Sequence, residues 1–481
     1  MSSRVMSFNP DTLPGPSRDL RTPPVKKMTV PFNQSFGSSV NENKRKGKFR
    51  ISNRKMRMIS RVKIPLSSIN QVDQIQMELQ AQLFVDDDDG HLNFDIGDTI
   101  EKYNLLGFLG KGTFGRVAKA RNLDTCQIVA LKIARSSEAC RESARNEIVI
   151  LKKLRDIDPD GKHLWIQMLD HFEFQGHICI AFEKLGDSLY SFLRENKYQP
   201  YQLSQIRHIA YQLCYSVKAL HDNMIIHTDL KPENICLVSS DFTYGIRATV
   251  ISKVKLTMVK SLRNGFKCAN SLTLRFITAV SLQYLHCTIH IVKSFSSPDG
   301  YDQLLLSCYI KRQQTYRKPI STNIRLIDFG SAVDFFDDKD IMIQTRYYRA
   351  PEVVFELQWN QAVDVWSIGC ILFELYTGEC LFTAHDDDEH YQVMLDVLGP
   401  FPDLYLSTKL SEKHKVTCPE HKKKSRKPLR KSMQMSAKEH QELFDLMEKM
   451  LNYNPEERLS LTAALKHPFF LLLSDEQKFK H

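Results

Sequence analysis

No two of the eleven cysteines in this 481-residue chain stand in a C-x-x-C spacing. Scattered thiols of this kind are typical of a reducing compartment and argue against a zinc site. The chain also lacks any apolar run near the roughly 20 residues that cross a bilayer. Its first residues, MSSRVMSFNPDTLPGPSRD, lack the charged and then apolar pattern of a secretory signal. We therefore expect a protein of the nucleus or the cytoplasm with no membrane segment.

Positive charge is concentrated near the N-terminus. The net charge is +10, and Lys44–Lys63 contains ten Lys and Arg residues and no acidic residue. Such a run indicates nuclear import or a weak contact with RNA, although a solvated tail with no partner explains it equally well. Residues 1–95 are rich in polar and basic residues and show little apolar periodicity. They are predicted to form a disordered basic tail that ends in the acidic run Asp86–Asp89.

The stretch Ile226–Leu237, IHTDLKPENICL, places a carboxylate, an ammonium and an amide on one polar turn between two apolar runs. Phosphoryl transfer requires a carboxylate that accepts the hydroxyl proton, a cation near the moving phosphate and an oxygen ligand for magnesium. Asp229, Lys231 and Asn234 would fill these roles in that order. The alternative is a polar loop whose Asp and Asn only cap turns. This stretch resembles the catalytic loop of a protein kinase.

A glycine-rich segment, GKGTFGRV, lies between two strand-like runs. Glycines let backbone N–H groups close over phosphates without side-chain clashes. A dinucleotide-binding turn would lead into a helix, whereas RVAKARN has the pattern of a strand, which favours the kinase hairpin. Lys132, at the end of the next strand, VALK, would hold the α- and β-phosphates of ATP. The predicted nucleotide-binding residues of this region are Gly110, Lys111, Gly112, Gly115, Val117, Ala130 and Lys132.

A helix is predicted from about Ser137 to Leu154, because apolar residues recur there at three- and four-residue spacing. Glu147, in its middle turns, is the expected ion-pair partner of Lys132. An ordinary solvated glutamate is the alternative. A second helix, buried and leading to the catalytic loop, is predicted over Ser204–His221.

The remaining kinase-like stretches follow in order. The run HICIAFEKLG would place Phe182 beside the adenine pocket, with the backbone of Glu183 and Leu185 bonded to the base. Asp328, in Asp-Phe-Gly after the strand IRLID, is expected to bind Mg²⁺. Asp364, at the start of an apolar helix, is expected to brace the catalytic loop. Arg458 is the expected buried partner of Glu352 in the Ala-Pro-Glu stretch.

From Asp98 to Phe470 the chain resembles a eukaryotic protein kinase, and several stretches are similar to the LAMMER family, the Clk dual-specificity kinases. These stretches are EKYNLLGFLGKGTFGRVAKA, HICIAFEKLG, HTDLKPENICLVSSDF, IRLIDFGSA, QTRYYRAPEVVFELQWNQAVDVWSIGCILFE and LFTAHDDDEHYQVMLDVLGPFP. The resemblance implies an α+β, two-lobed kinase fold with a small β-rich N-lobe (96–186), a large, mainly helical C-lobe (187–473) and a C-terminal tail (474–481). It also implies ATP and Mg²⁺ as cofactors, a nuclear location, Ser in Arg/Ser-rich splicing factors as the substrate, and autophosphorylation on Tyr.

Three features set the chain apart from a typical kinase. Thr228 stands where most kinases have Arg, a trait shared with the LAMMER family, and it implies an activation loop that needs no phosphorylation. The signature that names the family is kept only in part in Glu389–Asp396. Asn234 and Asp328 lie 94 positions apart (234 to 328), whereas a two-stranded hairpin needs only about 15.

The excess length lies in residues 246–310, which show no clean hydrophobic period. Either this stretch is a genuine element that covers the back of the C-lobe, or it is foreign to the mature protein, as a retained intron would be. The second interpretation is favoured, since sequences without consistent local signals rarely specify a fold.

Carboxylates near the expected cleft would pair with Arg side chains beside the target Ser. The candidates are Glu233, Asp334, Asp337, Asp338 and the run Asp386–Glu389, for which a solvated helix cap is the alternative. Two rival functions are a catalytically impaired pseudokinase scaffold and an RNA-binding adaptor. The adaptor would act through Lys44–Lys63 and Lys422–Lys431. The sequence gives no indication of the oligomeric state.

Overall fold

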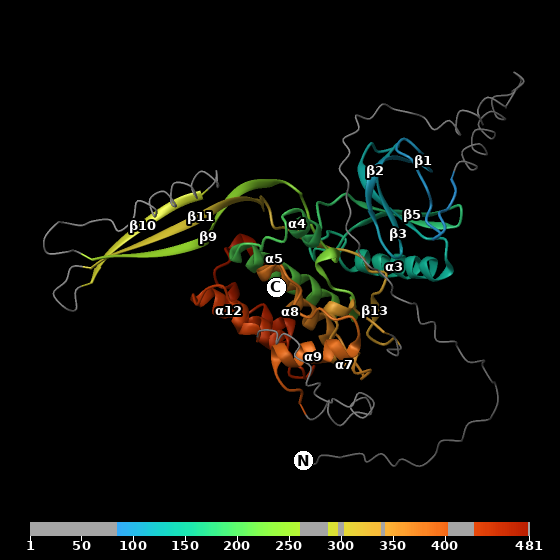
Figure 1. Cartoon of the computed structure of the whole chain (residues 1–481). Helices are drawn as coiled ribbons and strands as arrows, with labels where there is room; N and C mark the ends of the chain where they lie inside the picture. Colours follow the sequence, from blue (N-terminus) through green and yellow to red (C-terminus); the bar gives the residue numbers. More distant parts are fainter. Residues whose placement is uncertain (1–83, 260–286, 297–302, 338–341, 403–427, 480–481) are drawn as a thin grey trace, which may run out of the picture. The chain divides into compact units, whose positions relative to one another are not determined.

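The computed structural model of the chain describes residues 84–259, 287–296, 303–337, 342–402 and 428–479 (Figure 1). Residues 1–83, with the basic run Lys44–Lys63, lie outside these described residues. So do Asp338 and residues 422–427 of the second basic cluster.

The first part of the described chain is a six-stranded antiparallel sheet with the strand order β1-β2-β3-β4-β6-β5 (Figure 1). Side chains of a strand point alternately to its two faces. In β4, Val129, Leu131 and Ile133 are therefore buried in the core of the sheet, while Ala130 and Lys132 face the other side. The strands are Thr99–Ile100 (β1), Tyr103–Lys111 (β2), Gly115–Asn122 (β3), Ile128–Ala134 (β4), Met168–Phe174 (β5) and His177–Glu183 (β6).

The helix α3, Glu138–Ile157, packs on β4, β5 and β6 of this sheet (Figure 1). It confirms the predicted helix and continues three residues beyond the predicted end at Leu154. Its buried face consists of small and apolar residues with one charged exception, Glu147. A buried charge is stable only with a partner, so the position of Glu147 already indicates an ion pair.

The remainder of the described chain is mainly helical, with α5, Leu203–Asp222, and α8, Ala362–Thr377, at its centre. Almost every residue of α8 is buried, as expected for a helix that is apolar on all sides. The α5 helix confirms the prediction over Ser204–His221. The other α-helices are Leu189–Glu195 (α4), Pro351–Val354 (α7), Asp387–Leu398 (α9), Lys438–Met450 (α12) and Leu461–Ala464 (α13).

Two short sheets hold the segments that carry the predicted catalytic residues. One pairs β7, Ile225–Ile226, with β13, Val333–Asp334, and the other pairs β8, Ile235–Leu237, with β12, Ile324–Leu326. The single-turn 3-10 helices are Pro232–Asn234 (η1), Arg346–Tyr348 (η2), Leu429–Ser432 (η3), Pro468–Phe470 (η4) and Asp475–Gln477 (η5). The two-lobed α+β architecture is therefore confirmed. Among the described residues, no helix has the length and apolar character that crossing a membrane requires.

Both ends of the packed domain lie beyond the predicted boundaries. Residues 84–95, assigned to the tail from the sequence, include the buried His91 and Leu92. At the other end, Phe479 stacks on Tyr215 of α5, with ring centroids 4.5 Å apart, so residues 474–479 are not a free tail. The chain thus packs on both sides of the predicted boundaries, because long-range contacts of single side chains leave no periodic signal.

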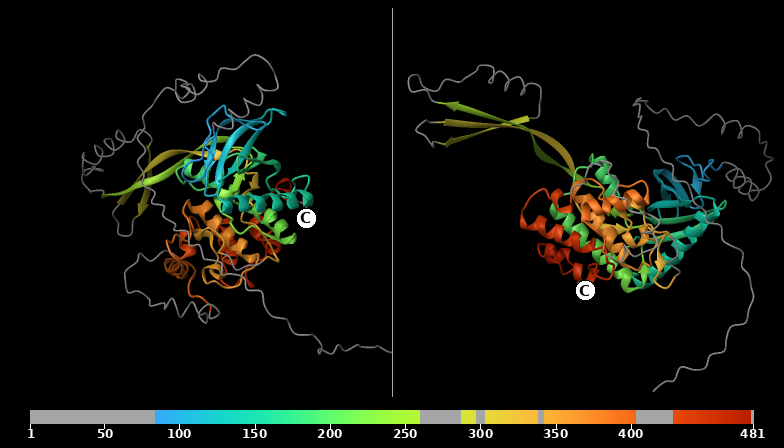
Figure 2. Two further views of the ribbon diagram at one scale, coloured as in Figure 1. Left: turned by 90° about the vertical axis from the view of Figure 1, so that its right-hand side faces the viewer. Right: turned by 60° about the horizontal axis from the view of Figure 1, so that its bottom comes forward.

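The long stretch before Asp328 contains three antiparallel strands in the order β10-β11-β9 (Figure 2). β9, Phe242–Val259, and β11, Gln303–Pro319, pair from Phe242 opposite Pro319 to Val259 opposite Gln303, and β10, Cys287–Ser296, pairs with β11. At the root of β9 and β11, the Asn196 amide donates to the Arg317 carbonyl oxygen (2.9 Å) and accepts from the Arg317 N–H (2.7 Å). That this stretch is foreign to the mature protein stays a prediction.

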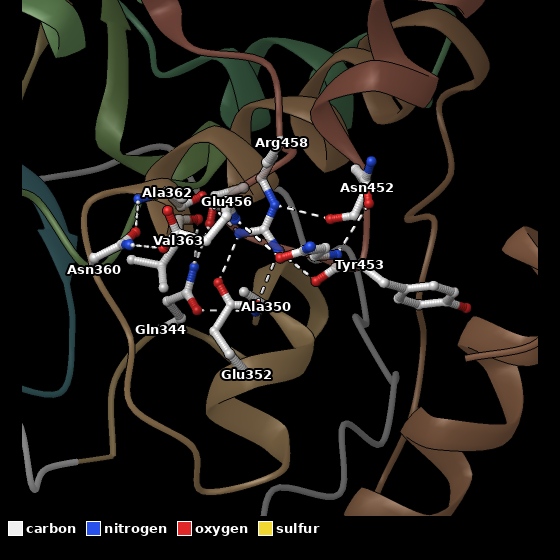
Figure 3. A network of polar contacts seen from close by, with 12 residues as sticks. Gln344, Ala350, Glu352, Asn360, Ala362, Val363, Asn452, Tyr453, Glu456 and Arg458 are labelled. Carbon is white, nitrogen blue, oxygen red and sulfur yellow. Dashed lines mark hydrogen bonds and ion pairs between the residues drawn. The ribbon is translucent and has the colours of Figure 1, made fainter. Parts of the chain in front are cut away.

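A buried ion pair joins two distant segments of the helical part (Figure 3). The Arg458 guanidinium donates to both oxygens of Glu352, at 2.6 and 2.9 Å, and both side chains are almost fully buried. Arg458 also donates to backbone carbonyl oxygens, including that of Ala362 at the start of α8 (2.8 Å). The pair predicted from the sequence is present, and it ties the Ala-Pro-Glu stretch to the base of α8.

We expect Arg458→Met to lower the free energy of unfolding by about 3–5 kcal/mol, because it leaves the Glu352 carboxylate buried without its partner. A matched control is Arg430→Met, since Arg430 makes the same two-bonded contact with Glu448 at the surface (2.6 Å for each bond). Exposed pairs contribute only about 0–1 kcal/mol. Urea unfolding followed by circular dichroism measures both. An equal loss of unfolding free energy in the two variants would contradict the stabilising role assigned to the buried Glu352–Arg458 pair.

Candidate functional site

The predicted catalytic loop is held from below by the buried carboxylate of Asp364. Its Oδ2 accepts hydrogen bonds from the His227 N–H (3.0 Å) and from His221 Nε2 (2.9 Å), and its Oδ1 accepts from the Thr228 N–H (3.0 Å). Asp364 is completely buried at the start of α8. The expected brace is therefore present, and it fixes the backbone of His227 and Thr228, the two residues that precede Asp229.

The backbone is strained at two points of the site. Thr228 and Asp328 both have left-handed conformations, with φ of 65° and 64°. Such conformations are unfavourable for residues other than glycine and persist where the surroundings enforce them, often at functional sites. The Thr228 hydroxyl donates to the Ser331 carbonyl oxygen (2.7 Å), and His227 Nε2 donates to the Ile327 carbonyl oxygen (3.1 Å). The catalytic loop and the Asp-Phe-Gly segment therefore hold each other in place.

Asp229, Lys231 and Thr345 form a tight cluster. Asp229 Oδ2 accepts from the Lys231 ammonium (2.6 Å), and its Oδ1 accepts from the Thr345 hydroxyl (2.7 Å) and N–H (3.1 Å). Lys231 also donates to the Thr345 hydroxyl (3.0 Å). Sequence reasoning missed Thr345, although it opens the TRYYRAPE run within a stretch that resembles the kinase family.

Asn234 links this cluster to Asp328. Its side-chain NH₂ donates to the Asp229 backbone carbonyl oxygen (2.9 Å), and the backbone carbonyl oxygen of Asn234 accepts from the Ile327 N–H (3.0 Å). The hydrogen bond engages the NH₂ end of the amide, so the oxygen end is the one that a metal ion would use. A carboxylate and an amide oxygen are hard ligands of the kind that Mg²⁺ takes, usually together with substrate phosphates. Asn234 and Asp328 thus fit a magnesium site.

Lys132 contacts two carboxylates from different parts of the chain. Its ammonium lies 2.7 Å from Glu147 Oε2 and 2.8 Å from Asp328 Oδ1. Burial disfavours its charge, but the two carboxylates outweigh this effect and raise the pKa of Lys132. Burial raises the pKa of Glu147, whereas at Asp328 the nearby Lys132 outweighs burial and lowers the pKa. The expected ion pair of Lys132 with Glu147 is present, so the alternative of a solvated glutamate is wrong.

The glycine-rich hairpin and the strands behind it bring several of the predicted nucleotide-binding residues together. In the sheet, Val117 lies opposite Lys132, and Ala130 lies opposite the buried Phe182. An added Cβ at Gly115 would lie 2.2 Å from the Ile133 carbonyl oxygen, so only glycine fits there.

The two earlier glycines are different. Around Gly110 and Gly112 an added Cβ would meet no atom within 4 Å, which leaves that side of the loop open to phosphates. Lys111 does not extend over this space, because its ammonium pairs with Asp87 (3.4 Å) and Asp89 (3.5 Å).

Of the two residues expected to bond the adenine base, Glu183 is the last residue of β6 and Leu185 follows the strand. The Glu183 N–H donates to the Gln167 carbonyl oxygen at 3.4 Å, and its carboxylate lies 3.7 Å from the Arg325 guanidinium. The Leu185 carbonyl oxygen accepts from the Lys184 ammonium (2.7 Å). The structure thus places these residues at the end of the strand that carries Phe182, and their contact with a base stays a prediction.

Most of the acidic residues named as substrate contacts are engaged within the chain. Asp334 pairs with Lys153 (2.7 Å), Asp387 pairs with Arg346, and Asp386 caps α9 by accepting from the Glu389 N–H (2.7 Å). The alternative of a helix cap is therefore correct for Asp386. Glu233 differs, because its Oε2 is buried and has no hydrogen-bond partner in the described part of the chain. Burial raises the pKa of this carboxyl group.

Comparisons with known proteins agree with this geometry. The family described as "Protein kinase domain" matches residues 103–256 and 311–470. Serine/threonine-protein kinase Doa of Drosophila melanogaster is 39% identical over 410 residues, which is 82% of this chain but only 42% of that protein. Dual specificity protein kinase CLK2 of Homo sapiens is 37% identical over 409 residues, 82% of this chain and 70% of that protein. The human dual specificity protein kinase CLK1 is also 37% identical, over 81% of this chain and 70% of its own length.

A solved structure shares the architecture. The crystal structure of a kinase domain aligns with a TM-score of 0.60 and 26% sequence identity, covering 80% of this chain and all of that chain. The family match skips residues 257–310, so the greater part of the long stretch between Asn234 and Asp328 has no counterpart in the family description.

Asp364→Asn should speed amide hydrogen exchange at His227 and Thr228 by about tenfold or more. Hydrogen bonds to a charged group contribute about 1.5–3 kcal/mol, and the variant removes that charge from both bonds. Hydrogen exchange with mass spectrometry or NMR measures the change. Asp222→Asn, at the exposed end of α5, is the control and should leave both amides unchanged. No increase in Asp364→Asn, or an equal one in the control, would refute the bracing role.

Proposed function

The chain belongs to the protein kinase family and, within it, to the group of the CLK and Doa dual-specificity kinases, and from this premise we propose that it transfers the γ-phosphoryl group of ATP to Ser and Thr side chains of proteins. The observation that supports this most directly is the junction of two charged clusters. Asp229, Lys231 and Thr345 form one, and Lys132, Glu147 and Asp328 form the other. The hydrogen bond from Ile327 to Asn234 links them.

Each side chain has a role that its surroundings favour. Asp229 orients the substrate hydroxyl and takes its proton, and Lys231 steadies the moving phosphoryl group. Lys132, oriented by Glu147, holds the phosphates that stay behind. Asp328 and Asn234 would hold Mg²⁺, which neutralises charge on the β- and γ-phosphate oxygens when bound.

The proposed substrates are proteins rich in Arg and Ser, such as splicing factors. Glu233 supports this choice, because its Oε2 is buried without a hydrogen-bond partner in the described part of the chain and is well suited to accept from an Arg guanidinium. A second buried carboxylate, Glu374, has its pKa raised to about 7, first by burial and also by the charge of Glu233. A substrate Arg bound to Glu233 would offset the repulsion between the two carboxylates. Glu374 accepts a hydrogen bond from the Tyr348 hydroxyl (2.6 Å).

The remaining proposals concern location and partners. A nuclear location, with the cytoplasm as a second compartment, follows from the family and from the basic run Lys44–Lys63, which also makes a weak RNA contact reasonable. Autophosphorylation on Tyr follows from the dual specificity in the names of the relatives.

One observation favours a second candidate, a catalytically impaired scaffold. The stretch that the family match skips lies between the two proposed metal ligands. A displacement of Asp328 by that stretch would prevent phosphoryl transfer while the rest of the domain stayed folded.

The first test is ATP- and Mg²⁺-dependent phosphorylation of an Arg-Ser repeat peptide. We expect activity in the full chain and its loss, by at least about a thousandfold, in Asp229→Asn, since that variant lacks the proton acceptor. A variant without residues 246–310 is the third sample. Activity only in this deletion would mark the stretch as foreign or inhibitory. If neither the full chain nor the deletion variant phosphorylates the peptide, although thermal unfolding shows that both are folded, the scaffold would be favoured.

A second test concerns the choice of substrate. Glu233→Gln should raise KM for an Arg-containing peptide about tenfold with little change in kcat, because it removes a charge-assisted hydrogen bond used in binding. A peptide with Ala in place of Arg should not distinguish the variant from the wild type. The control is Glu142→Gln, an exposed glutamate of α3. Loss of kcat with both peptides would assign Glu233 to the structure of the loop instead.

A further inference from the structure

The acidic run Asp86–Asp89 lies before the family match, which begins at residue 103, yet it is a folded part of the sheet lobe. Asp86 and Leu92 form an antiparallel bridge. The Asp87 N–H donates to the His91 carbonyl oxygen (2.9 Å), and the Asn93 N–H donates to the Val85 carbonyl oxygen (3.1 Å). Residues 85–93 thus form a tight turn, called the acidic turn below.

The acidic turn is anchored to the ends of two central strands. Asp86 accepts from the Ser136 hydroxyl (2.7 Å), just after β4, and from Nε2 of the buried His177 (2.9 Å), the first residue of β6. The Ser136 N–H donates to the Gly90 carbonyl oxygen (2.9 Å). Gly90 has φ of +78°, and an added Cβ would lie 2.9 Å from the Ser136 hydroxyl, so a glycine is required at this contact. The turn is therefore rigidly placed.

From this anchored position, Asp87 bridges the two arms of the glycine-rich hairpin. Its Oδ2 lies 2.7 Å from the Arg116 guanidinium and 3.4 Å from the Lys111 ammonium. Lys111 and Arg116 are paired opposite each other at the point where β2 and β3 enter the loop. Arg116 also donates to the Leu92 carbonyl oxygen (2.8 Å) and to the Asn93 side chain (2.7 Å). One carboxylate thus contacts both cations at the base of the loop, and Asp89 also contacts Lys111 (3.5 Å).

Arg135 extends the contact to the tip of the loop. Its Nε donates to the Asp89 carbonyl oxygen (2.6 Å), and its Nη1 donates to the Thr113 carbonyl oxygen (3.3 Å). Its backbone N–H donates to the Phe114 carbonyl oxygen (3.0 Å). The acidic turn therefore contacts the base of the hairpin through Asp87 and its tip through Arg135.

We propose that Asp87 is a positioning residue that holds the glycine-rich loop in its nucleotide-binding arrangement, through ion pairs with Arg116 and Lys111. The inference rests on the proposed function, since this loop is the one assigned to the phosphates of ATP. A loop that is fixed in advance loses less conformational entropy when it closes over a ligand. The carboxylate stays ionised at neutral pH, because the His91 N–H and the two cations lower the pKa of Asp87 to about 2.

The matched pair Asp87→Asn and Asp88→Asn tests this. Both variants remove one negative charge from the acidic turn, but Asp88 makes no hydrogen bond or ion pair with the described part of the chain. Three quantities are measured: the Kd of a fluorescent ADP analogue with Mg²⁺, KM for ATP and for peptide, and amide exchange of residues 112–114 in the nucleotide-free chain. For Asp87→Asn we expect faster loop exchange and a rise of about three- to tenfold in nucleotide Kd and KM for ATP, with KM for peptide unchanged. Asp88→Asn should match the wild type.

A double-variant cycle with Arg116→Gln sharpens the test. If the two residues act through their contact, the combined variant weakens nucleotide binding less than the product of the two single effects. Unchanged loop exchange in Asp87→Asn would overturn the proposal, as would equal effects in Asp88→Asn. Tighter nucleotide binding would also overturn it, by showing that Asp87 competes with phosphates for the two cations. A wild-type chain that binds nucleotide but transfers no phosphate would overturn the proposed function alone, since loop exchange and nucleotide Kd still report the bracing.

Discussion

The site depends first on one buried carboxylate, that of Asp364. It lies at the start of α8, a helix with almost every residue buried, and three N–H groups from α5 and the catalytic loop converge on it. Charge-assisted hydrogen bonds of this kind are among the stronger polar contacts in proteins. Because Asp364 fixes the backbone at Thr228, which has a strained left-handed conformation, the position of Asp229 follows from the helical core and not from the loop itself. The Glu352–Arg458 pair ties the Ala-Pro-Glu stretch to the base of the same helix.

The second constraint joins the sheet to the helical part. Lys132 comes from a central strand, Glu147 from α3 and Asp328 from the segment after β12, and the three meet without an intervening residue. Each element is positioned by ordinary apolar packing: alternation in β4 puts Lys132 on the site face, and the helical period of α3 turns Glu147 inward. Since these charges are partly or fully buried, each offsets the cost of burying the others, and the three elements are held together at this point.

Much of this was predictable because the signals are local. The strand that carries Lys132, the period of α3 and the DLKPEN turn are each contained in twenty residues or fewer, and a pattern within one element determines which side chains share a face. Thr345 and Asp87 could not be found in this way. Thr345 contacts Asp229 across 116 positions, and Asp87 contacts Arg116 across 29, with no repeating pattern in either case. The contacts at the two ends of the domain are also long-range, since Asp86 bonds to His177 across 91 positions and Phe479 stacks on Tyr215 of α5.

The root of the β9–β11 ladder has an architectural consequence. Phe242 and Pro319 face each other across the two strands, and β8 and β12 then continue the two chains to Asn234 and Asp328. The segment from residue 242 to residue 319 therefore begins and ends at one point of the domain. The entropy of closing such an excursion grows only slowly with its length, at about 0.6 kcal/mol for each doubling. The domain can thus carry sequence of widely varying length at this point, because the β8–β12 pairing and the hydrogen bond from the Ile327 N–H to the Asn234 carbonyl oxygen hold the segments of the two proposed metal ligands together.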